Sequence, residues 1–258
     1  MQLSGKIVLI TGASSGIGAL TALRLAERGA VPILTARSES KLHAVAAKLP
    51  GRHAVRRLDV TDARQIEETV LDITAEFGGI DILVNNAGYG VFDYVAEASL
   101  EEYESMMDVN YMGTVRCTKA VLPQMLARGS GHIVNVASLA GKFGSAKSAG
   151  YSATKHAVLG FTSSLRQELF GTGVGLTAIN PGPIDTPFFD KADPSGNYVK
   201  NVSWLLLKPE TVVAAMLRAI ERGTADVILP GYAGIGVKLA QMFPRSFDRF
   251  AHKLLNKK

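Results

Sequence analysis

The sequence has little of what metal sites and disulfides require. Its 258 residues include a single cysteine, Cys117, so an internal disulfide is excluded and a reducing, cytoplasmic setting is expected. Cys117 falls in a stretch with helical periodicity, where we expect it to be a small buried hydrophobe. The five histidines show no ligand spacing such as H-x-x-x-H. We therefore expect no metal site.

Long hydrophobic runs are also missing. No run of about 18 apolar residues occurs, so we expect no helix that spans a membrane. The apolar run near the N-terminus is only as long as one strand, and no secretory signal is expected. A hydrophobic content of 47% and a charged content of 20% are typical of globular proteins. The length suits one α/β domain with a sizeable core.

Charge of one sign is in excess only at the C-terminal end. The net charge of +5 resides in residues 232–258, which contain six basic residues and one acidic residue. The rest of the chain is balanced, with 22 basic and 22 acidic residues. A neutral body with a basic tail does not indicate a nucleic-acid-binding domain. It favours a local function of the tail, such as contact with an acidic surface.

The basic tail also carries an apolar pattern. Phe243, Phe247, Phe250 and Leu254 recur with the spacing of one helical face, beside a stripe of cations. Such a helix over 243–255 could lie at a membrane interface. The helix could instead pack beside the opening of the protein's own substrate site or on a second subunit. We favour packing over membrane contact.

Strand-like and helical patterns alternate along the rest of the chain. Alternation of this kind predicts βαβ units, with a parallel sheet and helices on both of its faces. Strands are expected over 7–10, 31–35, 54–58, 82–85, 132–136, 175–179 and 227–229, and helices near 19–28, 39–48, 62–77, 100–108, 112–128, 151–170 and 209–222.

The segment 183–208 departs from this alternation. It mixes Pro, Gly, Asp and Asn with the large apolar residues Phe188, Phe189, Tyr198 and Trp204. A long connection with apolar side chains of its own is typical of a lid over a binding site. An ordinary packed excursion would have the same composition, so both interpretations stay open.

A glycine-rich loop follows the first predicted strand. Residues 11–18 read TGASSGIG and stand between an apolar, β-branched run and a helical stretch. Glycines allow a tight turn and a close approach to phosphate, and the following helix offers free N–H groups to an anion. The spacing differs from that of an ATP-type phosphate loop. We expect a nucleotide-binding loop rather than a turn without a ligand.

Tyr151 and Lys155 lie four residues apart in a predicted helix, with Ser138 thirteen positions upstream. Residues at this helical spacing share one face. A phenol ionises near pH ~10, and a nearby ammonium group lowers its pKa, so the pair can act as a general acid/base. The Ser138 hydroxyl can polarise a carbonyl. Taken alone, the Y-x-x-x-K pattern is as often a pair that merely lines a helix.

Together these patterns resemble the short-chain dehydrogenase/reductase family. The resemblance implies one dinucleotide-binding domain over 1–231, an α/β fold with a doubly wound, parallel, seven-stranded, Rossmann-like sheet. Residues 183–208 would be the substrate lid, and 232–258 a helical C-terminal extension. The resemblance runs to about Gly231 and rests on TGASSGIG, Asp59-Val60, Asn85-Asn86-Ala87-Gly88, Asn110, Ser138, YSATK at 151–155 and Pro181-Gly182-Pro183-Ile184-Asp185-Thr186.

The resemblance also implies where a nicotinamide dinucleotide binds. Asp59 would contact adenine, although it could equally cap a turn because Thr61 and Asp62 follow it. The expected cofactor-binding residues are Gly12, Ser14, Ser15, Gly16, Ile17, Gly18, Arg37, Ser38, Asp59, Val60, Asn86, Ala87, Gly88, Tyr151, Lys155, Pro181, Gly182, Ile184 and Thr186.

The end of the second predicted strand indicates which cofactor is used. An acidic residue there would bind a ribose 2′-hydroxyl and favour NAD(H). The strand instead ends before Arg37 and Ser38, and a guanidinium group suits a 2′-phosphate. We therefore favour NADP(H), unless Arg37 is only a surface cation. Glu39 could swing in, and Ser15 stands where many NADP-using relatives have a second basic residue.

The implied mechanism is hydride transfer between the cofactor and a carbonyl or secondary alcohol. Ser138 would hold the carbonyl oxygen, and Tyr151 would give it a proton. Lys155 would lower the phenol pKa and bond the nicotinamide ribose, while Asn110 would hold a relay water. The substrate is expected to be a small carbonyl compound or alcohol, with an apolar one as an option, and the assembly a homodimer or homotetramer.

Two other functions stay open at this stage. A 3-oxoacyl-carrier-protein reductase would share the motifs, but the C-terminal extension and Ser15 count against it. A catalytically silent nucleotide-sensing protein would keep the fold and lose the chemistry. The presence of the whole set Asn110, Ser138, Tyr151 and Lys155 counts against that alternative. A hydrolase is disfavoured because Ser138 is not in a G-x-S-x-G context.

Overall fold

Seven strands form one parallel sheet in the computed structural model, which describes residues 1–194, 196–243 and 245. The strand order is β3-β2-β1-β4-β5-β6-β7, and every neighbouring pair is parallel. The chain winds outward in both directions from β1 and β4, so the predicted doubly wound sheet is confirmed. The strands are β1 (Ile7–Thr11), β2 (Val31–Ala36), β3 (Ala54–Arg57), β4 (Ile82–Asn85), β5 (Gly131–Val136), β6 (Val174–Pro181) and β7 (Asp226–Leu229).

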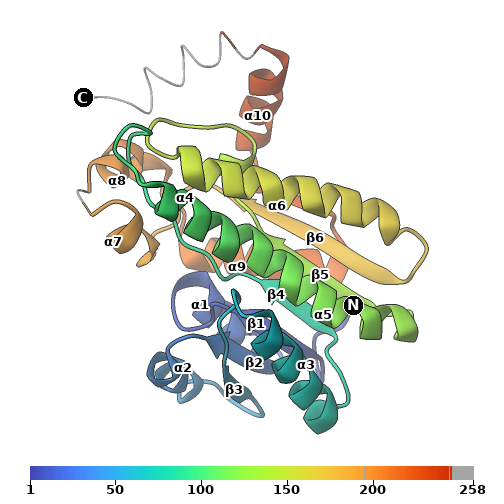
Figure 1. Cartoon of the computed structure of the whole chain (residues 1–258). Coiled ribbons are helices and arrows are strands. Elements are labelled where there is room, and N and C mark those ends of the chain that lie inside the picture. Colours follow the sequence, from blue (N-terminus) through green and yellow to red (C-terminus); the bar gives the residue numbers. More distant parts are fainter. Residues whose placement is uncertain (195, 244, 246–258) are drawn as a thin grey trace.

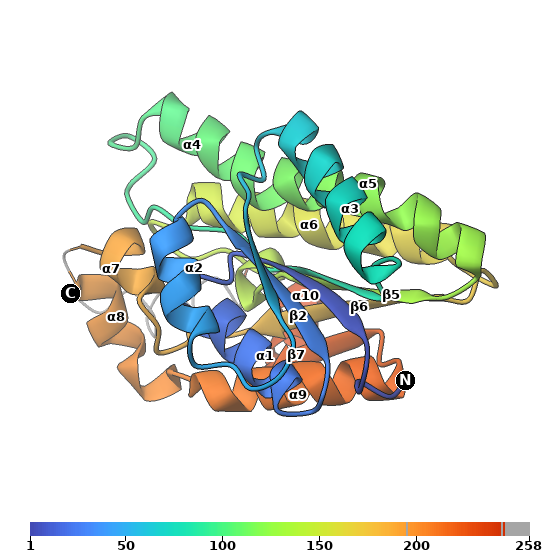
Figure 2. The same cartoon turned by 90° about the horizontal axis from the view of Figure 1, so that it is seen from below.

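Helices cover both faces of the sheet, and Figures 1 and 2 show the three layers. The helices α1, α2 and α9 pack on one face, and α3, α5 and α6 pack on the other. Their bounds are α1 (Gly16–Ala26), α2 (Glu39–Ala46), α3 (Ala63–Phe77), α4 (Leu100–Met107), α5 (Gly113–Arg128), α6 (Ala149–Glu168) and α9 (Pro209–Arg222).

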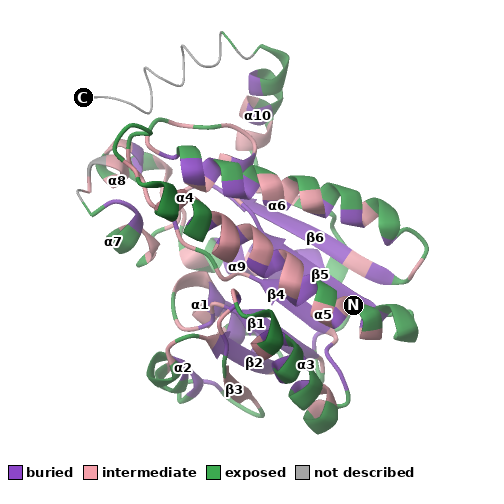
Figure 3. Ribbon diagram, viewed as in Figure 1, coloured by how far each residue is buried: buried purple, intermediate pink, exposed green. Residues whose placement is uncertain are grey.

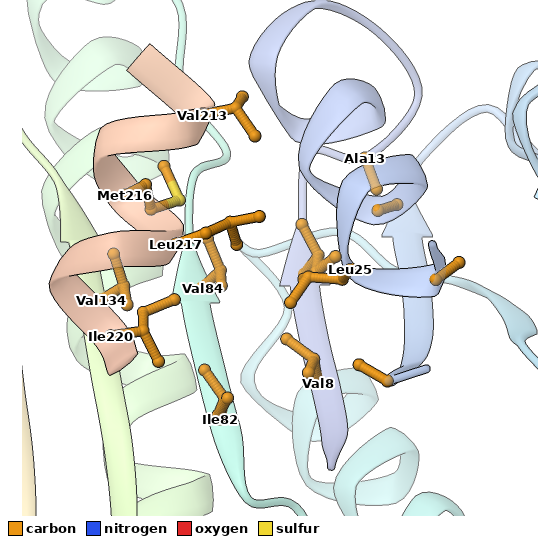
Figure 4. Close-up of a cluster of buried hydrophobic side chains, with 14 of the residues drawn as sticks. Val8, Ala13, Leu25, Ile82, Val84, Val134, Val213, Met216, Leu217 and Ile220 are labelled. Carbon is orange, nitrogen blue, oxygen red and sulfur yellow. The ribbon is translucent and has the colours of Figure 1, made fainter. Parts of the chain in front are cut away.

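Alternation along the central strand β1 divides the core into two clusters. Val8 and Ile10 join the cluster under α1 and α9, whereas Ile7 and Leu9 join the cluster under α3, α5 and α6. Successive strand residues point to opposite faces, so a strand buried on both sides must be apolar throughout. Figure 3 shows the buried strands between helices with exposed outer faces, and Figure 4 shows the first cluster. Each fully buried aliphatic side chain contributes about 1.5–3 kcal/mol.

Two predicted helices are joined in the structure. Residues 100–128 form a continuous helical run in which a π-helical turn, Asp108–Met112, links α4 to α5. The helices predicted near 100–108 and 112–128 are separated by a gap at this turn, so the sequence pattern did not predict that they are continuous. The first helix begins at Gly16 instead of at position 19, so Ile17 and Gly18 belong to its first turn.

The predicted lid contains two short helices, α7 (Phe188–Ala192) and α8 (Asn197–Val202), followed by a 3₁₀ helix over Ser203–Leu205. Its two ends are tied together, because Leu207 N donates to Pro183 O at 2.8 Å and Asp185 N donates to Leu207 O at 3.0 Å. Both views place α7 and α8 at one edge of the molecule (Figures 1 and 2). The segment is therefore a closed excursion held at its base.

The C-terminal extension begins with the helix α10 (Ala233–Met242). The helical face predicted over 243–255 lies outside the described residues apart from Phe243 and Arg245. Phe243 follows the end of α10 and is exposed. No helix among the residues that the structure describes is long and apolar enough to cross a membrane.

Candidate active site

A cavity of about 670 Å³ opens at the carboxyl ends of the strands β1, β2, β4, β5 and β6. In doubly wound sheets this edge is where ligands bind. Every residue predicted to bind the cofactor lines the cavity, and so does Ser138. Asn110 is the exception among the predicted site residues, because it is buried behind the wall.

The glycine loop is locked against the segment that follows β4. Asn86 Nδ2 donates to Thr11 O at 2.9 Å and to Gly12 O at 3.1 Å. Gly12 has a φ of +66°, and a Cβ atom on it would lie 2.8 Å from Ala87 Cα. A Cβ atom on Gly18 would overlap the Gly12 carbonyl oxygen. Glycine is required at both positions because two backbone segments approach each other closely.

The N-terminus of α1 offers an anion site to the cavity. Ser15 is the N-cap residue, but its side chain makes no capping hydrogen bond. Ser15, Gly16 and Ile17 all line the cavity, and the first turn of α1 contains no acidic residue. Amide groups of a first helical turn lack intrahelical partners and carry the positive end of the helix dipole. These residues fit the pyrophosphate of a dinucleotide.

A pair of cations flanks the same cavity at the start of α2. Arg37 directly follows β2, and Lys41 lies one helical turn further on; both are exposed and both line the cavity. Glu39, whose approach the sequence left open, lies 3.7 Å from His43 along the helix, and the described lining residues do not include it. Sequence reasoning missed Lys41. A cation in the first turn of a predicted helix is unfavourable for the dipole, and that signal could have revealed it.

Asp59 holds the turn after β3. Its Oδ1 accepts hydrogen bonds from Thr61 N at 3.0 Å and from Thr61 Oγ1 at 2.9 Å, while the residue also lines the cavity. Asp62 is the N-cap of α3 and accepts from Gln65 N at 3.0 Å. The hydrogen bonds of the Asp59 carboxylate are therefore those of a residue that caps a turn.

Ser138 ties the ends of two strands together beside the cavity. It follows β5, its Oγ accepts from Ala140 N at 3.0 Å, and its hydroxyl donates to Pro181 O at 3.4 Å at the end of β6. The phenol of Tyr151 lines the same cavity, so both hydroxyl groups are available to a ligand there.

Burial raises the pKa of Tyr151 above its usual value, and the nearby Ser138 side chain lowers it only partly. The aromatic ring of Phe188, with its centroid 5.5 Å away, and that of Phe92, at 5.8 Å, remove water from around the phenol. Desolvation disfavours the phenolate. Lys155 is not among the causes of this shift, which are burial, Ser138 and Tyr198, so the expected lowering of the pKa by Lys155 is not seen, and the protonated phenol is favoured.

Lys155 lies one helical turn after Tyr151 and is 5% exposed. Its Nζ donates to Val136 O at 2.8 Å and lies 5.6 Å from the centroid of the Tyr151 ring. Burial lowers the pKa of Lys155 to about 8. The ammonium group therefore lies at the cavity wall. With a pKa of about 8, it begins to lose its proton just above neutral pH.

Asn110 lies in the π-helical turn and acts on the site through its neighbours. Its Nδ2 donates to Tyr89 O at 2.8 Å and to Thr154 Oγ1 at 3.1 Å, and its Oδ1 accepts from Tyr89 N at 2.9 Å. Thr154 in turn donates to Tyr151 O at 2.8 Å. The hydrogen bonds of the Asn110 amide group thus connect the loop after β4 to α6. Thr154 lies between Tyr151 and Lys155 in the YSATK motif, and no role was predicted for it from the sequence.

The cavity has a second part, on the side of the lid. Its wall is formed by the segment after β5, by Tyr151 and by residues of α7, α8 and the 3₁₀ helix. We call this the lid-side part of the cavity, and it is lined by Leu139, Phe143, Ser145, Tyr151, Phe188, Phe189, Asp190, Lys191, Tyr198, Val202 and Leu205.

A doubly wound parallel sheet with a glycine-walled cavity at its switch point defines a dinucleotide-binding α/β protein. The model of the family described as short chain dehydrogenase matches residues 6–196. The chain therefore belongs to the short-chain dehydrogenase/reductase family of oxidoreductases, as the motifs predicted.

Relatives and solved structures agree with this assignment. An uncharacterized oxidoreductase of Staphylococcus saprophyticus is 44% identical over 197 residues, which cover 75% of this chain and 84% of the relative. A short-chain dehydrogenase from Streptomyces avermitilis superposes with a TM-score of 0.82 at 30% identity, over 94% of this chain and 95% of the other. A serine dehydrogenase solved in its closed form with NADP⁺ gives a TM-score of 0.79 at 36% identity, over 86% and 94%.

Proposed function

We propose that the protein is an NADP(H)-dependent oxidoreductase that interconverts a carbonyl compound and a secondary alcohol, with Tyr151 as the general acid/base. The observation that carries this proposal is the convergence of Ser138, Tyr151 and Lys155 on one cavity whose other wall is a glycine loop and an uncapped helix N-terminus. A catalytic acid and an anion site that share a cavity are what such a reaction needs.

The residues of the glycine loop and of the first turn of α1 would hold a nicotinamide dinucleotide, which would supply or accept the hydride. The chain's own residues then have three tasks. Ser138 donates a hydrogen bond to the substrate oxygen and orients it, and the protonated phenol of Tyr151 delivers a proton to that oxygen. Lys155 keeps a positive charge beside the phenol, which stabilises the negative charge that remains on Tyr151 after the transfer. A phenol that is protonated at neutral pH suits the reductive direction.

The preference for NADP(H) rests on charge. Arg37 and Lys41 place two cations at the cavity wall after β2, and Glu39 is paired with His43. Cations suit a 2′-phosphate, whereas the ribose 2′-hydroxyl of NAD(H) is usually held by a carboxylate. The 36%-identical serine dehydrogenase was solved with NADP⁺, which agrees with this preference.

Other substrates and roles have less support. A serine-like substrate carries two charges, and the charged lining residues of the lid-side part are the exposed Asp190 and Lys191. A silent nucleotide sensor has no need of a desolvated tyrosine beside a buried lysine. A 3-oxoacyl-carrier-protein reductase would share the catalytic residues, and substrate profiling separates it from a general carbonyl reductase.

We also propose that the chain forms a homodimer or homotetramer. Large apolar side chains of the segment around α10 face solvent, with Tyr232 65%, Ile235 67% and Leu239 50% exposed. Apolar patches of this kind mark interfaces more often than free surface. Size-exclusion chromatography with light scattering would contradict the proposal by showing a monomer at micromolar concentration.

The test of the proposed activity is turnover of a panel of ketones, aldehydes and secondary alcohols with each nicotinamide cofactor. We expect reduction of at least one ketone, faster with NADPH than with NADH. Tight binding of NADPH without turnover of any panel member would contradict the catalytic proposal and favour the silent sensor. Equal kcat/KM for the two cofactors would contradict only the cofactor preference.

A further inference from the structure

The lid-side part of the cavity is walled by large apolar side chains. Phe188 and Phe189 come from α7, Leu205 comes from the 3₁₀ helix, and Leu139 and Phe143 come from the segment after β5. Apolar walls favour apolar ligand surface, because water leaves both surfaces on binding. This wall therefore selects for a ligand with a substantial apolar part.

The polar groups of this wall are few and mostly neutral. Ser145 and Tyr198 contribute hydroxyl groups, in addition to Ser138 and Tyr151 at the reaction centre. Among the described residues that line the lid-side part of the cavity, the charged ones are Asp190 and Lys191, both exposed residues of α7. A carboxylate carried into this part of the cavity would lose its hydration without gaining a buried cation, which is costly.

The aromatic wall is held in place by a ring that does not itself line the cavity. Phe92 contacts Tyr198, Phe189 and Phe188, with ring centroids at 4.7, 6.1 and 6.3 Å, and also contacts Tyr151. Its backbone N donates to Ala192 O at 2.8 Å, which ties the loop after β4 to the end of α7. The rings are therefore fixed relative to Tyr151 before any substrate arrives.

Gly90 makes room for this arrangement. A Cβ atom at this position would lie 3.0 Å from Phe188 Cζ, 3.2 Å from Phe92 Cε1 and 3.2 Å from Tyr151 Cδ2. Such contacts are tighter than ordinary van der Waals distances, so a side chain here would require the neighbouring rings to shift by a few tenths of an ångström. The glycine therefore allows the three rings to pack closely around this position.

We infer that the lid-side part of the cavity binds a bulky, uncharged carbonyl compound that carries an aromatic ring, and that Phe188 contacts this ring beside the reacting carbonyl. The inference rests on the proposed function and narrows its substrate class. Aromatic rings prefer offset or edge-to-face contacts with one another, which aliphatic groups cannot reproduce. Phe92 serves as a positioning residue for Phe188 and for the phenol of Tyr151.

The experiment compares two ketones of nearly the same size that differ in charge. Methyl 4-acetylbenzoate and 4-acetylbenzoate are each offered to the wild-type protein with NADPH, and kcat/KM for reduction is measured for each. We expect the neutral ester to be preferred by about 10- to 100-fold, because the carboxylate must be buried without a partner. Equal values, or a preference for the carboxylate, would overturn the inference.

Variants test the contact with Phe188. Phe188→Ala should lower kcat/KM for the aromatic ester about 10-fold more than it lowers kcat/KM for butanone, which has no ring to contact. Phe170→Ala is the matched control, because Phe170 is 91% exposed and lies outside the cavity lining. An equal loss on both ketones in Phe188→Ala would show that Phe188 only positions Tyr151, and would overturn the contact.

A binding measurement separates failure of the inference from failure of the proposed function. Thermal shifts are recorded with NADP⁺ present, for the alcohols derived from the ester and from the carboxylate. An increase in melting temperature that only the neutral alcohol causes would support the proposed substrate class. If no ketone were turned over as well, the proposed activity would be wrong while the substrate class would stand. Turnover of both ketones without a preference leaves the activity standing and overturns the inference.

Discussion

The two parts of the cavity are built in opposite ways. On the nucleotide side the wall is mostly backbone and small residues, with Gly12 and Gly18 packed so closely that no side chain fits. On the lid side the wall is made of large rings contributed by segments that are far apart in the sequence, among them Phe143 and Phe188. Tyr151 lies where the two parts meet.

The contrast separates what is general in this fold from what is particular to this chain. Backbone amides and a helix terminus recognise phosphate, which every dinucleotide carries, so the same loop can serve many enzymes. In the proposed function, side chains of the segment 183–208 would recognise the substrate, and side chains in such a connection can change without altering the nucleotide wall. We therefore expect substitutions in one part to leave the other part's preference intact.

The largest effect is expected where the two parts meet. Tyr151→Phe should lower kcat for ketone reduction by about 10²–10⁴-fold, because the phenol supplies the proton. The affinity for NADPH, measured by fluorescence titration, should change little, since the anion site lies on α1. A variant that kept more than about a tenth of the wild-type activity would contradict the role given to Tyr151.

The nucleotide side is tested by reversing charge at its outer end. Arg37→Asp should shift the NADPH/NADH ratio of kcat/KM toward NADH by about 10- to 100-fold, because a charge-assisted contact becomes a repulsion. Lys41→Gln should shift it in the same direction by less. Lys48→Asp is the control, since Lys48 lies just beyond the end of α2 and outside the lining. An unchanged ratio in Arg37→Asp would show that Arg37 is a surface cation.

The buried charge of Lys155 should lower the free energy of unfolding at neutral pH. Its pKa of about 8 lies below the ordinary value of 10.5, so the unfolded state binds more protons between these two pH values. Stability therefore rises with pH across this window, and at neutral pH the buried charge is destabilising. Lys155→Met should raise the free energy of unfolding at pH 7 by about 1–3 kcal/mol while impairing turnover.

Urea unfolding at pH 7 and pH 9.5 measures this difference. The gap between Lys155→Met and the wild type should narrow as the pH rises, because the wild-type lysine loses its charge. Lys119→Met, a change at an exposed lysine of α5, is the control and should leave stability nearly unchanged. A Lys155→Met protein less stable than the wild type at pH 7 would mean that the bond to Val136 O outweighs the desolvation.

A smaller effect is expected far from both parts of the cavity. Burial lowers the pKa of His132 on β5 from 6.5 to about 4, so the unfolded state binds more protons between these values and stability falls as the pH drops through this window. His132→Gln should reduce the loss of stability between pH 7 and pH 5 by about 1–2 kcal/mol. His53→Gln serves as the control. An unchanged acid sensitivity in His132→Gln would refute the assignment to His132.

The sequence predicted nearly all the residues that line the nucleotide side of the cavity, for a physical reason. Its parts are contiguous, as in the loop over 11–18 and the run over 85–88, so spacing alone reports the geometry. The strand alternation likewise predicted the sheet, because strands buried on both faces read as short apolar runs. Lys41 was missed because a cation on a helix is usually a solvated surface residue.

The lid side could be predicted only in outline. The apolar content of 183–208 indicated a lid, but Phe92 and Gly90 lie about a hundred residues upstream, and only the fold brings them to Phe188. The pKa of Tyr151 was expected to be lowered by Lys155. The rings beside the phenol come from other segments, so the burial that raises this pKa was not visible in the motif.

The independence of the two parts is tested most directly by a double-mutant cycle. The wild type, Arg37→Asp, Phe188→Ala and the double variant are compared for kcat/KM with both cofactors and with methyl 4-acetylbenzoate and butanone. We predict that Arg37→Asp changes only the cofactor ratio, that Phe188→Ala changes only the ketone ratio, and that their effects add within about 0.5 kcal/mol. A ketone ratio that moves as much in Arg37→Asp as in Phe188→Ala would contradict the account.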